Sequence, residues 1–275
     1  MTTLFNYIPR PSPVHALTGA AKLMCMLCWT LAAMLSFDTR FLIVLTVMAL
    51  ILFRVSRIKL REVKVLLIFS LAFVLLNNVL IYLFSPEHGV TLYDSRTVLF
   101  HIAGRYTVTS QQLLYQLNVF LKYTATIPIV LLFVCTTQPS EFAASLNGIG
   151  VSYRVSYSVS LALRYIPDIM KEYRDISLAQ QARGVELSNK ENLFRRLKGV
   201  TAILLPLILS SLDRIEVVST AMELRCFGKE KKRTWYRGRP FQTADYLVFA
   251  LGALLLALSI GLNIVNGGRF WNPFV

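Results

Sequence analysis

The stretch VLLIFSLAFVLLNNVLIYLF, residues 65–84, decides the fold class, because it is twenty residues long and carries no charged side chain. A helix needs about 20 apolar residues to cross the hydrocarbon core of a bilayer. Comparable apolar runs occupy residues 17–36, 39–54, 113–135 and 245–265, of which the run at 39–54 is the shortest. The sequence therefore predicts an all-α polytopic membrane protein with about five transmembrane helices in the lipid bilayer.

The composition of the 275-residue chain agrees with this fold class. Hydrophobic residues make up 55% of it and charged residues only 16%, which is more apolar than a typical soluble domain. The formal net charge of +14 would suggest a nucleic-acid partner in a soluble protein. A membrane protein, however, carries its excess of Lys and Arg in cytoplasmic loops, so we expect no nucleic-acid partner.

The distribution of Lys and Arg predicts the orientation of the helices. The segment RVSRIKLREVK (54–64) holds five basic residues and one acidic residue, so it should face the cytoplasm together with the N-terminus. By alternation, 85–112 and the C-terminal GGRFWNPFV (267–275) should lie outside. The segment 136–243 should then return to the cytoplasm.

This last segment differs in character from the rest of the chain. Between Lys171 and Arg239 it carries 15 Lys and Arg and 8 Asp and Glu, which is too polar for a membrane span. The sequence therefore suggests a division into N-terminal transmembrane helices (1–135), a cytoplasmic helical region (136–243) and a C-terminal transmembrane helix (244–275).

One pattern occurs twice within the cytoplasmic region. The apolar stretches LALRYIPDIM (161–170) and TAILLPLILSSL (201–212) each contain one proline, and each is followed by a charged stretch. We expect two long helices that begin at the membrane and end in the cytosol; the alternative is an amphipathic helix lying on anionic lipid headgroups. The two charged stretches end at Ala182-Arg183-Gly184 and Leu224-Arg225-Cys226.

Polar residues in and near the spans have ordinary structural explanations. The Asn pair at 77–78 is expected to make hydrogen bonds between helices, and Lys122 should reach the membrane interface or face a protein partner. The basic segment KEKKRTWYRGR (229–239) suits an anchor at the membrane surface, with Trp235 at the interface.

The sequence offers no constellation for catalysis. It contains no G-x-x-x-x-G-K-[ST], H-E-x-x-H or G-x-S-x-G motif, and its four cysteines and three scattered histidines match no metal-site pattern. The carboxylates Asp168, Glu172 and Asp175 are expected to pair along their own helix with Lys171 and Arg174. We therefore predict a protein that is not an enzyme and has no cofactor or metal.

The run TTQPSEFAASLNGIGVSYRVSYSVSLALRYIPDIMKEYRDISLAQQARG (136–184), followed by LLPLILSSLDRIEVVSTAMELRCFG (204–228), resembles the EcfT/CbiQ family. This family comprises the transmembrane T components of energy-coupling factor (ECF) transporters. The resemblance implies a non-catalytic scaffold subunit in a prokaryotic cell membrane. Its implied partners are two cytoplasmic ABC-type ATPases, which hydrolyse the ATP, and a membrane S component that binds a vitamin or transition metal ion.

The resemblance also implies that two coupling helices each end in an Ala-Arg-Gly-like motif that contacts one ATPase. Ala182, Arg183 and Gly184 match this motif fully. At the second motif Arg225 matches, but Leu224 and Cys226 replace the usual Ala and Gly, so a contact of different shape is expected there.

Two alternatives come from other classes. One is a membrane-embedded enzyme with its active site in the polar region 136–243. The other is a permease subunit of a conventional ABC importer, for which one short coupling helix would be expected rather than two.

Overall fold

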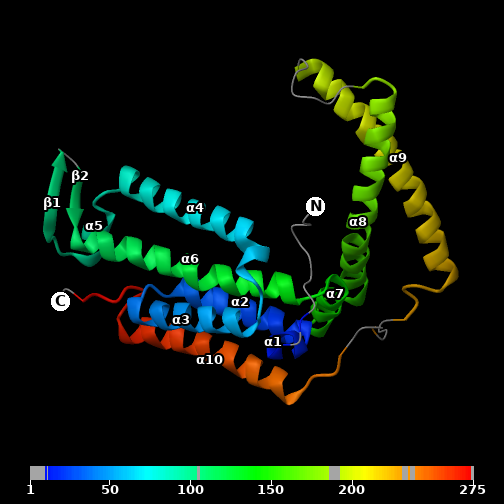
Figure 1. Cartoon of the computed structure of the whole chain (residues 1–275). Helices are drawn as coiled ribbons and strands as arrows, with labels where there is room; N and C mark the ends of the chain where they lie inside the picture. Colours follow the sequence, from blue (N-terminus) through cyan, green and yellow to red (C-terminus); the bar gives the residue numbers. More distant parts are fainter. Residues whose placement is uncertain are drawn as a thin grey trace. The chain divides into compact units, whose positions relative to one another are not determined.

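The structure, a computed structural model, describes residues 10, 12–103, 106–185, 193–230, 235 and 239–273. These residues are mostly helical, and one two-stranded hairpin is the only sheet among them (Figure 1). They form two compact units, the first made of Met1–Gln138 with Arg239–Val275 and the second of Pro139–Gly238. The predicted all-α fold class is therefore confirmed.

Each of the five predicted spans forms a helix in the first unit. Three helices are long and apolar enough to cross a membrane: α4 (Leu60–Phe84), α6 (Ser110–Thr136) and α10 (Thr243–Val265). The helices α2 (Gly19–Leu35) and α3 (Thr39–Val55) have 17 residues each, which is the short end of the range for a membrane span. A single turn, α1 (Pro13–Ala16), precedes them.

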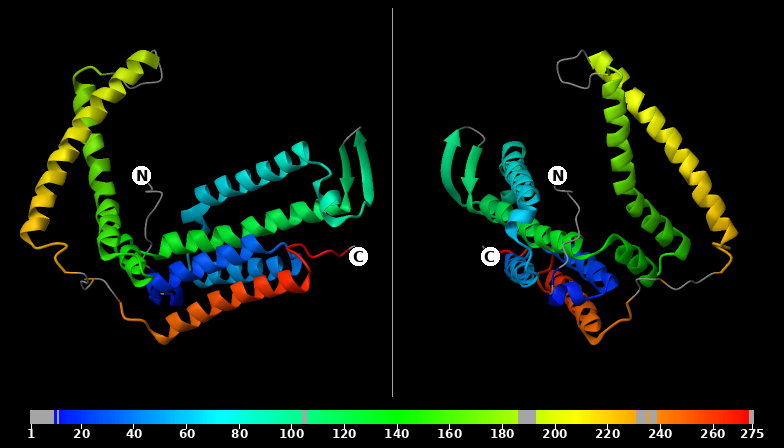
Figure 2. Two further views of the ribbon diagram at one scale, coloured as in Figure 1. Left: turned by 180° about the vertical axis from the view of Figure 1, so that it is seen from behind. Right: turned by 45° about the vertical axis from the view of Figure 1, so that its right-hand side comes forward.

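Close packing in the first unit depends on small residues between the helices. α10 lies along α2, α3 lies along α6, and α4 also contacts α6 (Figures 1 and 2). Gly252 of α10 allows a close approach, because an added Cβ would lie 3.2 Å from the Cβ of Cys28 on α2. The buried Trp29 donates its indole N–H to the carbonyl of Ala125 at 3.1 Å. The main core consists of Trp29, Ala32, Ala33, Phe41, Leu45, Ala49, Ala125, Ile129 and Leu255.

Lys122 is buried in this interior, so of its two predicted places the one that faces a protein partner was wrong. Its ammonium donates to the carbonyl of Met34 at 2.9 Å and lies 3.1 Å from the centroid of the Phe37 ring. Asn118 and Asn263 donate to the carbonyls of Phe37 and Leu35 at 3.2 Å each. The last carbonyls of a helix lack partners within the helix. At the end of α2, side chains from α6 and α10 donate hydrogen bonds to these carbonyls.

The prediction for Asn78 needs correction. Its side chain donates to the carbonyl of Val74 in its own helix at 2.9 Å rather than to another helix, although its backbone carbonyl accepts from Gln116 of α6.

The segment between α4 and α6 contains short regular elements. It contains α5 (His88–Tyr93) and the antiparallel strands β1 (Val98–Ala103) and β2 (Tyr106–Thr109), with Val98 opposite Thr109.

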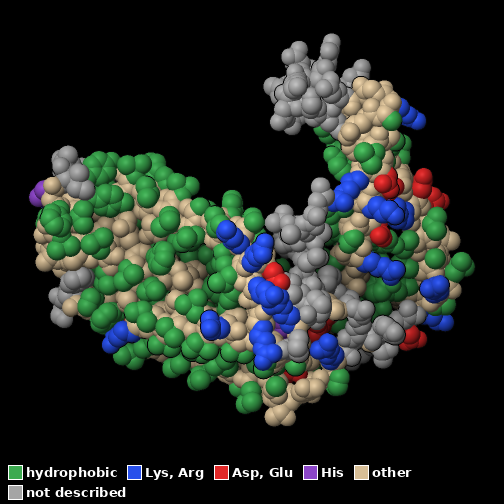
Figure 3. All heavy atoms as spheres, viewed as in Figure 1, with side chains coloured by type: hydrophobic (Ala, Val, Ile, Leu, Met, Phe, Trp, Pro, Cys, Tyr) green, Lys and Arg blue, Asp and Glu red, His purple; other side chains and the backbone are tan. Residues whose placement is uncertain are grey.

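One end of the first unit joins the N-terminal region, the α3–α4 turn and the start of α10. The backbone N–H of Thr18 donates to Asp245 at 2.8 Å, and Arg10 forms an ion pair with Glu62 at 2.7 Å. Figure 3 shows Lys and Arg side chains gathered toward this end, whereas the surface over α4 and α6 is mainly apolar.

The other end of the first unit joins the α2–α3 turn, α5 and the C-terminal residues. Phe37 and Phe270 stack with ring centroids 4.4 Å apart, and Asn272 donates to the carbonyl of Tyr93 at 3.2 Å. The segments predicted on opposite sides of the membrane thus lie at opposite ends of this unit.

The second unit is built around two long helices. A short helix, α7 (Pro139–Gly148), leads into α8 (Tyr153–Ala182) and α9 (Leu193–Leu224), which cross each other (Figures 1 and 2). Their 30 and 32 residues correspond to about 45 Å of helix each. On α9, Ile203 and Leu207 are buried, while most other large apolar side chains of the described helix are exposed.

Candidate functional site at two helix ends

The first motif is the C-terminal cap of α8. Helical hydrogen bonding ends at Ala182, Arg183 takes the cap position, and Gly184 adopts a left-handed φ of 84°. The N–H of Gly184 donates to the carbonyl of Gln181 at 2.9 Å, and the N–H of Val185 donates to the carbonyl of Gln180 at 3.0 Å. This pair of bonds defines a Schellman motif, in which glycine is favoured because the left-handed conformation costs it nothing.

The second motif forms the same cap at the end of α9. Cys226 has a left-handed φ of 54°. Its N–H donates to the carbonyl of Glu223, and the N–H of Phe227 donates to the carbonyl of Met222, both at 2.9 Å. Arg225 therefore occupies the position that Arg183 occupies in the first cap. The two triplets share one backbone structure, although the sequence led us to expect contacts of different shape.

Both motifs present their side chains to solvent. Ala182, Arg183 and Gly184 are exposed, as are Arg225 and Cys226. Leu224 is 81% exposed, so the second cap offers an apolar side chain where the first offers a methyl group. An arginine at a helix C-terminus is also favourable to the helix, because the exposed carbonyls there carry partial negative charge.

The six motif residues were predicted from the sequence, but the cap that each triplet forms was not. The signal was present, since a glycine directly after the last charged residue of a helical pattern marks a helix end. At the second motif this signal was lost, because cysteine occupies the position that usually carries glycine or asparagine.

Aromatic residues hold the chain directly after the second motif. The ring of Phe227 lies 5.7 Å from that of Tyr153 and 4.6 Å from that of Tyr157, both in the first turns of α8. Trp235 lies 5.6 Å from Tyr153 and donates its indole N–H to the side-chain oxygen of Asn147 at 3.1 Å. Trp235 therefore packs within the second unit, and its place at the membrane interface stays a prediction; most of the surrounding basic segment lies outside the described residues.

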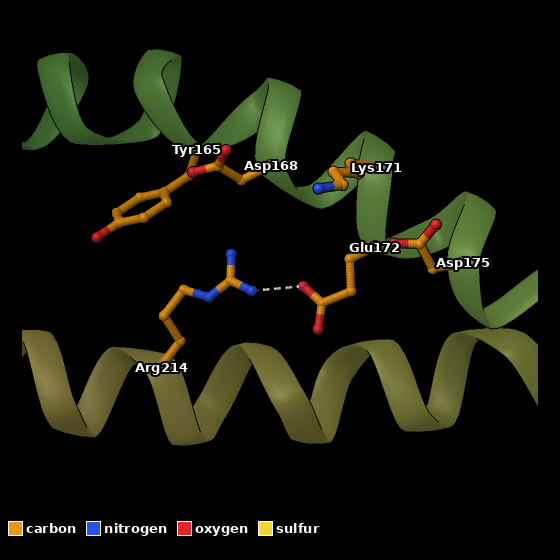
Figure 4. A pocket seen from close by; sticks show the side chains of 6 residues that line it. All are labelled: Tyr165, Asp168, Lys171, Glu172, Asp175 and Arg214. Atoms are coloured by element: carbon orange, nitrogen blue, oxygen red, sulfur yellow. Dashed lines mark hydrogen bonds and ion pairs between the residues drawn. The ribbon is translucent and has the colours of Figure 1, made fainter.

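A group of polar side chains lies where α8 and α9 cross. Figure 4 shows Glu172 of α8 directed at Arg214 of α9, and their side chains form an ion pair at 2.6 Å. Glu172 was expected to pair along its own helix, but its partner lies on the neighbouring helix. The same open hollow is lined by Tyr165, Asp168, Lys171, Glu172, Asp175 and Arg214. Among the described residues, no group of three or more His, Cys, Asp or Glu side chains is placed to hold a metal ion.

Comparison with known proteins adds an independent observation. Residues 10–236 match the sequence model of the CbiQ family, described as cobalt transport protein. The energy-coupling factor transporter transmembrane protein EcfT of Streptococcus equi subsp. equi is 27% identical over 260 residues, which cover 92% of this chain and 93% of the relative. The proteins of the same name from Staphylococcus aureus and Bacillus selenitireducens are each 29% identical, over 251 and 273 residues.

The alignment with the Staphylococcus aureus protein covers 87% of this chain and 89% of the relative. The alignment with the Bacillus selenitireducens protein covers 95% of this chain and 97% of the relative. The match therefore includes both the transmembrane helices and the two capped helices. The chain belongs to the CbiQ/EcfT family, the transmembrane components of energy-coupling factor transporters.

Proposed function

We propose that the chain is the scaffold that joins two cytoplasmic ABC-type ATPases to a membrane S component and transmits ATP-driven movement between them. The transported substrate is a vitamin or a transition metal ion. The observation that carries this proposal is the pair of matching caps at the ends of α8 and α9, each presenting an exposed arginine. Two equal contact elements suit two ATPases of the same fold. The family is one of transport proteins, so ATP hydrolysis falls to these partner subunits.

The proposed contact depends on the chemistry of arginine. A guanidinium offers five N–H donors in a planar fork that fits carboxylates and exposed carbonyl oxygens. At the first cap the small neighbours Ala182 and Gly184 let a partner surface approach the backbone closely. At the second cap Leu224 would bury its exposed side chain against the surface of the ATPase, which adds apolar contact.

The proposed orientation places the N-terminus and the region 136–243 in the cytoplasm of a prokaryotic cell, between transmembrane segments at 1–135 and 244–275. It is supported by the basic turn between α3 and α4, which lies at the same end of the first unit as the start of α10. The C-terminus of α6, where the chain leaves for the second unit, lies there too, since Lys22 of α2 donates to the carbonyl of Thr136 at 3.1 Å. Lys and Arg are enriched on the cytoplasmic side of membrane proteins.

Substitution of the two arginines tests the proposal. Arg183→Ala and Arg225→Ala each remove an arginine that the proposed contact would bury and pair, which should cost about 2–5 kcal/mol of binding free energy. Each change should sharply reduce substrate uptake by cells while the chain still inserts in the membrane. The double substitution should release the ATPases from the complex purified in detergent.

Arg164→Ala is the matched control, because Arg164 is an exposed arginine of the same helix α8, far from its cap. It should cost under about 1 kcal/mol, as surface charges usually do. If the helices instead lie on lipid headgroups, the three arginines contribute similarly to membrane attraction. Equal, mild effects of the three single changes would therefore contradict the proposal.

A further inference from the structure

We infer that Glu172, Ser210 and Arg214 lock the register in which α8 and α9 cross, and that this lock sets the positions of the two arginine motifs. The inference rests on the proposed role of these motifs as ATPase contacts. It assigns positioning roles to three residues that make no contact with the motifs themselves. Four features of the crossing support it.

The first feature is that two residues of α9 donate hydrogen bonds to the two oxygens of one carboxylate on α8. Arg214 donates to one oxygen of Glu172 at 2.6 Å, and the hydroxyl of Ser210 donates to the other oxygen. Ser210 and Arg214 are four residues apart, so they lie one above the other on the same face of α9. A slip by one helical turn, about 5.4 Å, would take the carboxylate away from one of the two donors.

The second feature is the place of the Arg214 guanidinium between two residues of α8. It lies 6.0 Å from the centroid of the Tyr165 ring, on the side opposite to Glu172 (Figure 4). Tyr165 and Glu172 are seven residues apart, which places them on one face of α8 two turns from each other. The ion pair is also partly shielded from water, since the side chains of Glu172 and Arg214 are 19% and 35% exposed.

The third feature is the apolar packing on the same face of α9. Ile203 and Leu207 are buried, and the spacing of 203, 207, 210 and 214 places them on the face that carries Ser210 and Arg214. Apolar contacts are not directional, so they tolerate sliding of one helix along another. A polar group at one position in an apolar interface fixes the register instead.

The fourth feature is the equal spacing of the two motifs from the crossing. Arg183 follows Glu172 by eleven residues, and Arg225 follows Arg214 by eleven residues. Each motif therefore lies about 16 Å of helix beyond the ion pair. Rotation about the crossing would displace the two motifs by equal amounts, whereas a slip of one helix along its own axis would change the distance from the crossing to the motif on that helix alone.

The test uses the complete complex of the chain with its ATPases and S component. Glu172→Gln and Arg214→Gln each remove one side of the ion pair, and both should leave the ATPases attached and active. Uptake per ATP hydrolysed should fall about tenfold, a size typical of residues that act in one hydrogen-bond network. Asp175→Asn is the control, because Asp175 is an exposed carboxylate one turn from Glu172 and lines the same hollow.

Two readouts separate positioning from general stability. The charge exchange Glu172→Arg with Arg214→Glu restores an ion pair at the crossing and should recover most of the lost coupling. Spin labels at the exposed positions Leu178 and Val217 should give a narrow distance distribution in the wild-type complex and in the charge-exchanged complex. The distribution should broaden in Glu172→Gln.

Coupling of Glu172→Gln equal to that of Asp175→Asn would overturn the inference, and so would an assembled charge-exchanged complex that stays uncoupled. If Glu172→Gln or Arg214→Gln fails to assemble, uptake per ATP hydrolysed by the charge-exchanged complex alone tests the inference. Recovered coupling supports it, and an assembled but uncoupled complex overturns it. A different measurement tests the proposed function. If the ATPases remain bound to the chain that carries both Arg183→Ala and Arg225→Ala, the proposed motif contacts are refuted, independently of the results for the Glu172 variants.

Discussion

At the scale of single residues, Cys226 adopts the left-handed conformation that Gly184 adopts at the equivalent place in the other cap. For a residue with a Cβ this conformation costs roughly 1–2 kcal/mol. The two helix ends therefore share a hydrogen-bond pattern but differ in backbone strain. No heavy atom lies within 4 Å of the Cβ that an alanine would add at Gly184, so the conformation alone should decide the cost of that change.

Hydrogen–deuterium exchange should detect this difference. Gly184→Ala should weaken the first cap by about 1 kcal/mol and speed exchange of the Val185 amide about fivefold. Cys226→Gly should relieve the second cap and slow exchange of the Phe227 amide. Cys226→Ala is the control, because it removes the sulfur and keeps the strain, so Phe227 should exchange as in the wild type. Faster exchange of Phe227 in Cys226→Gly would contradict the assignment.

At the scale of secondary-structure elements, Lys122 ties α6 to the end of α2. Lys122→Met keeps the length of the side chain but leaves the partly buried carbonyl of Met34 without its charged donor. This should cost about 2 kcal/mol and lower the Tm of the chain in detergent by roughly 5 °C. Lys64→Met removes an exposed lysine of α4 and should leave the Tm unchanged. Equal Tm values for the two variants would show that the Lys122 contact contributes nothing.

The membrane helices were predictable from the sequence because length and apolar composition alone decide them. The hairpin β1–β2 was not predicted, since its strands are short, lack a strong alternation and pair with two register shifts. Of the candidate site, the sequence indicated the six motif residues, whose role stays a prediction. The partner of Glu172 was missed, because basic residues nearby on the same helix already offered ion-pair partners. Arg214 is 42 residues away in the sequence. Lys122 was misplaced for a similar reason, as its partner is a backbone carbonyl on another helix.

At the scale of the whole molecule, the chain has one unit with helices that can span a membrane and a second unit that carries two exposed arginine caps. The central claim is that these caps contact the ATPases. A photo-crosslinking residue in the caps tests this claim without depending on transport activity. Ala182 and Leu224 are suitable positions, because both are exposed and neither replaces an arginine. Phe100, 73% exposed on the hairpin of the first unit, is the control.

The most direct measurement is therefore benzoylphenylalanine crosslinking at positions 182, 224 and 100, in membranes that contain the ATPases and the S component. The account predicts adducts between the chain and an ATPase from positions 182 and 224, and none from position 100, which should lie on the other side of the membrane. Adducts with lipid alone at both cap positions, or an ATPase adduct of equal yield from position 100, would contradict it.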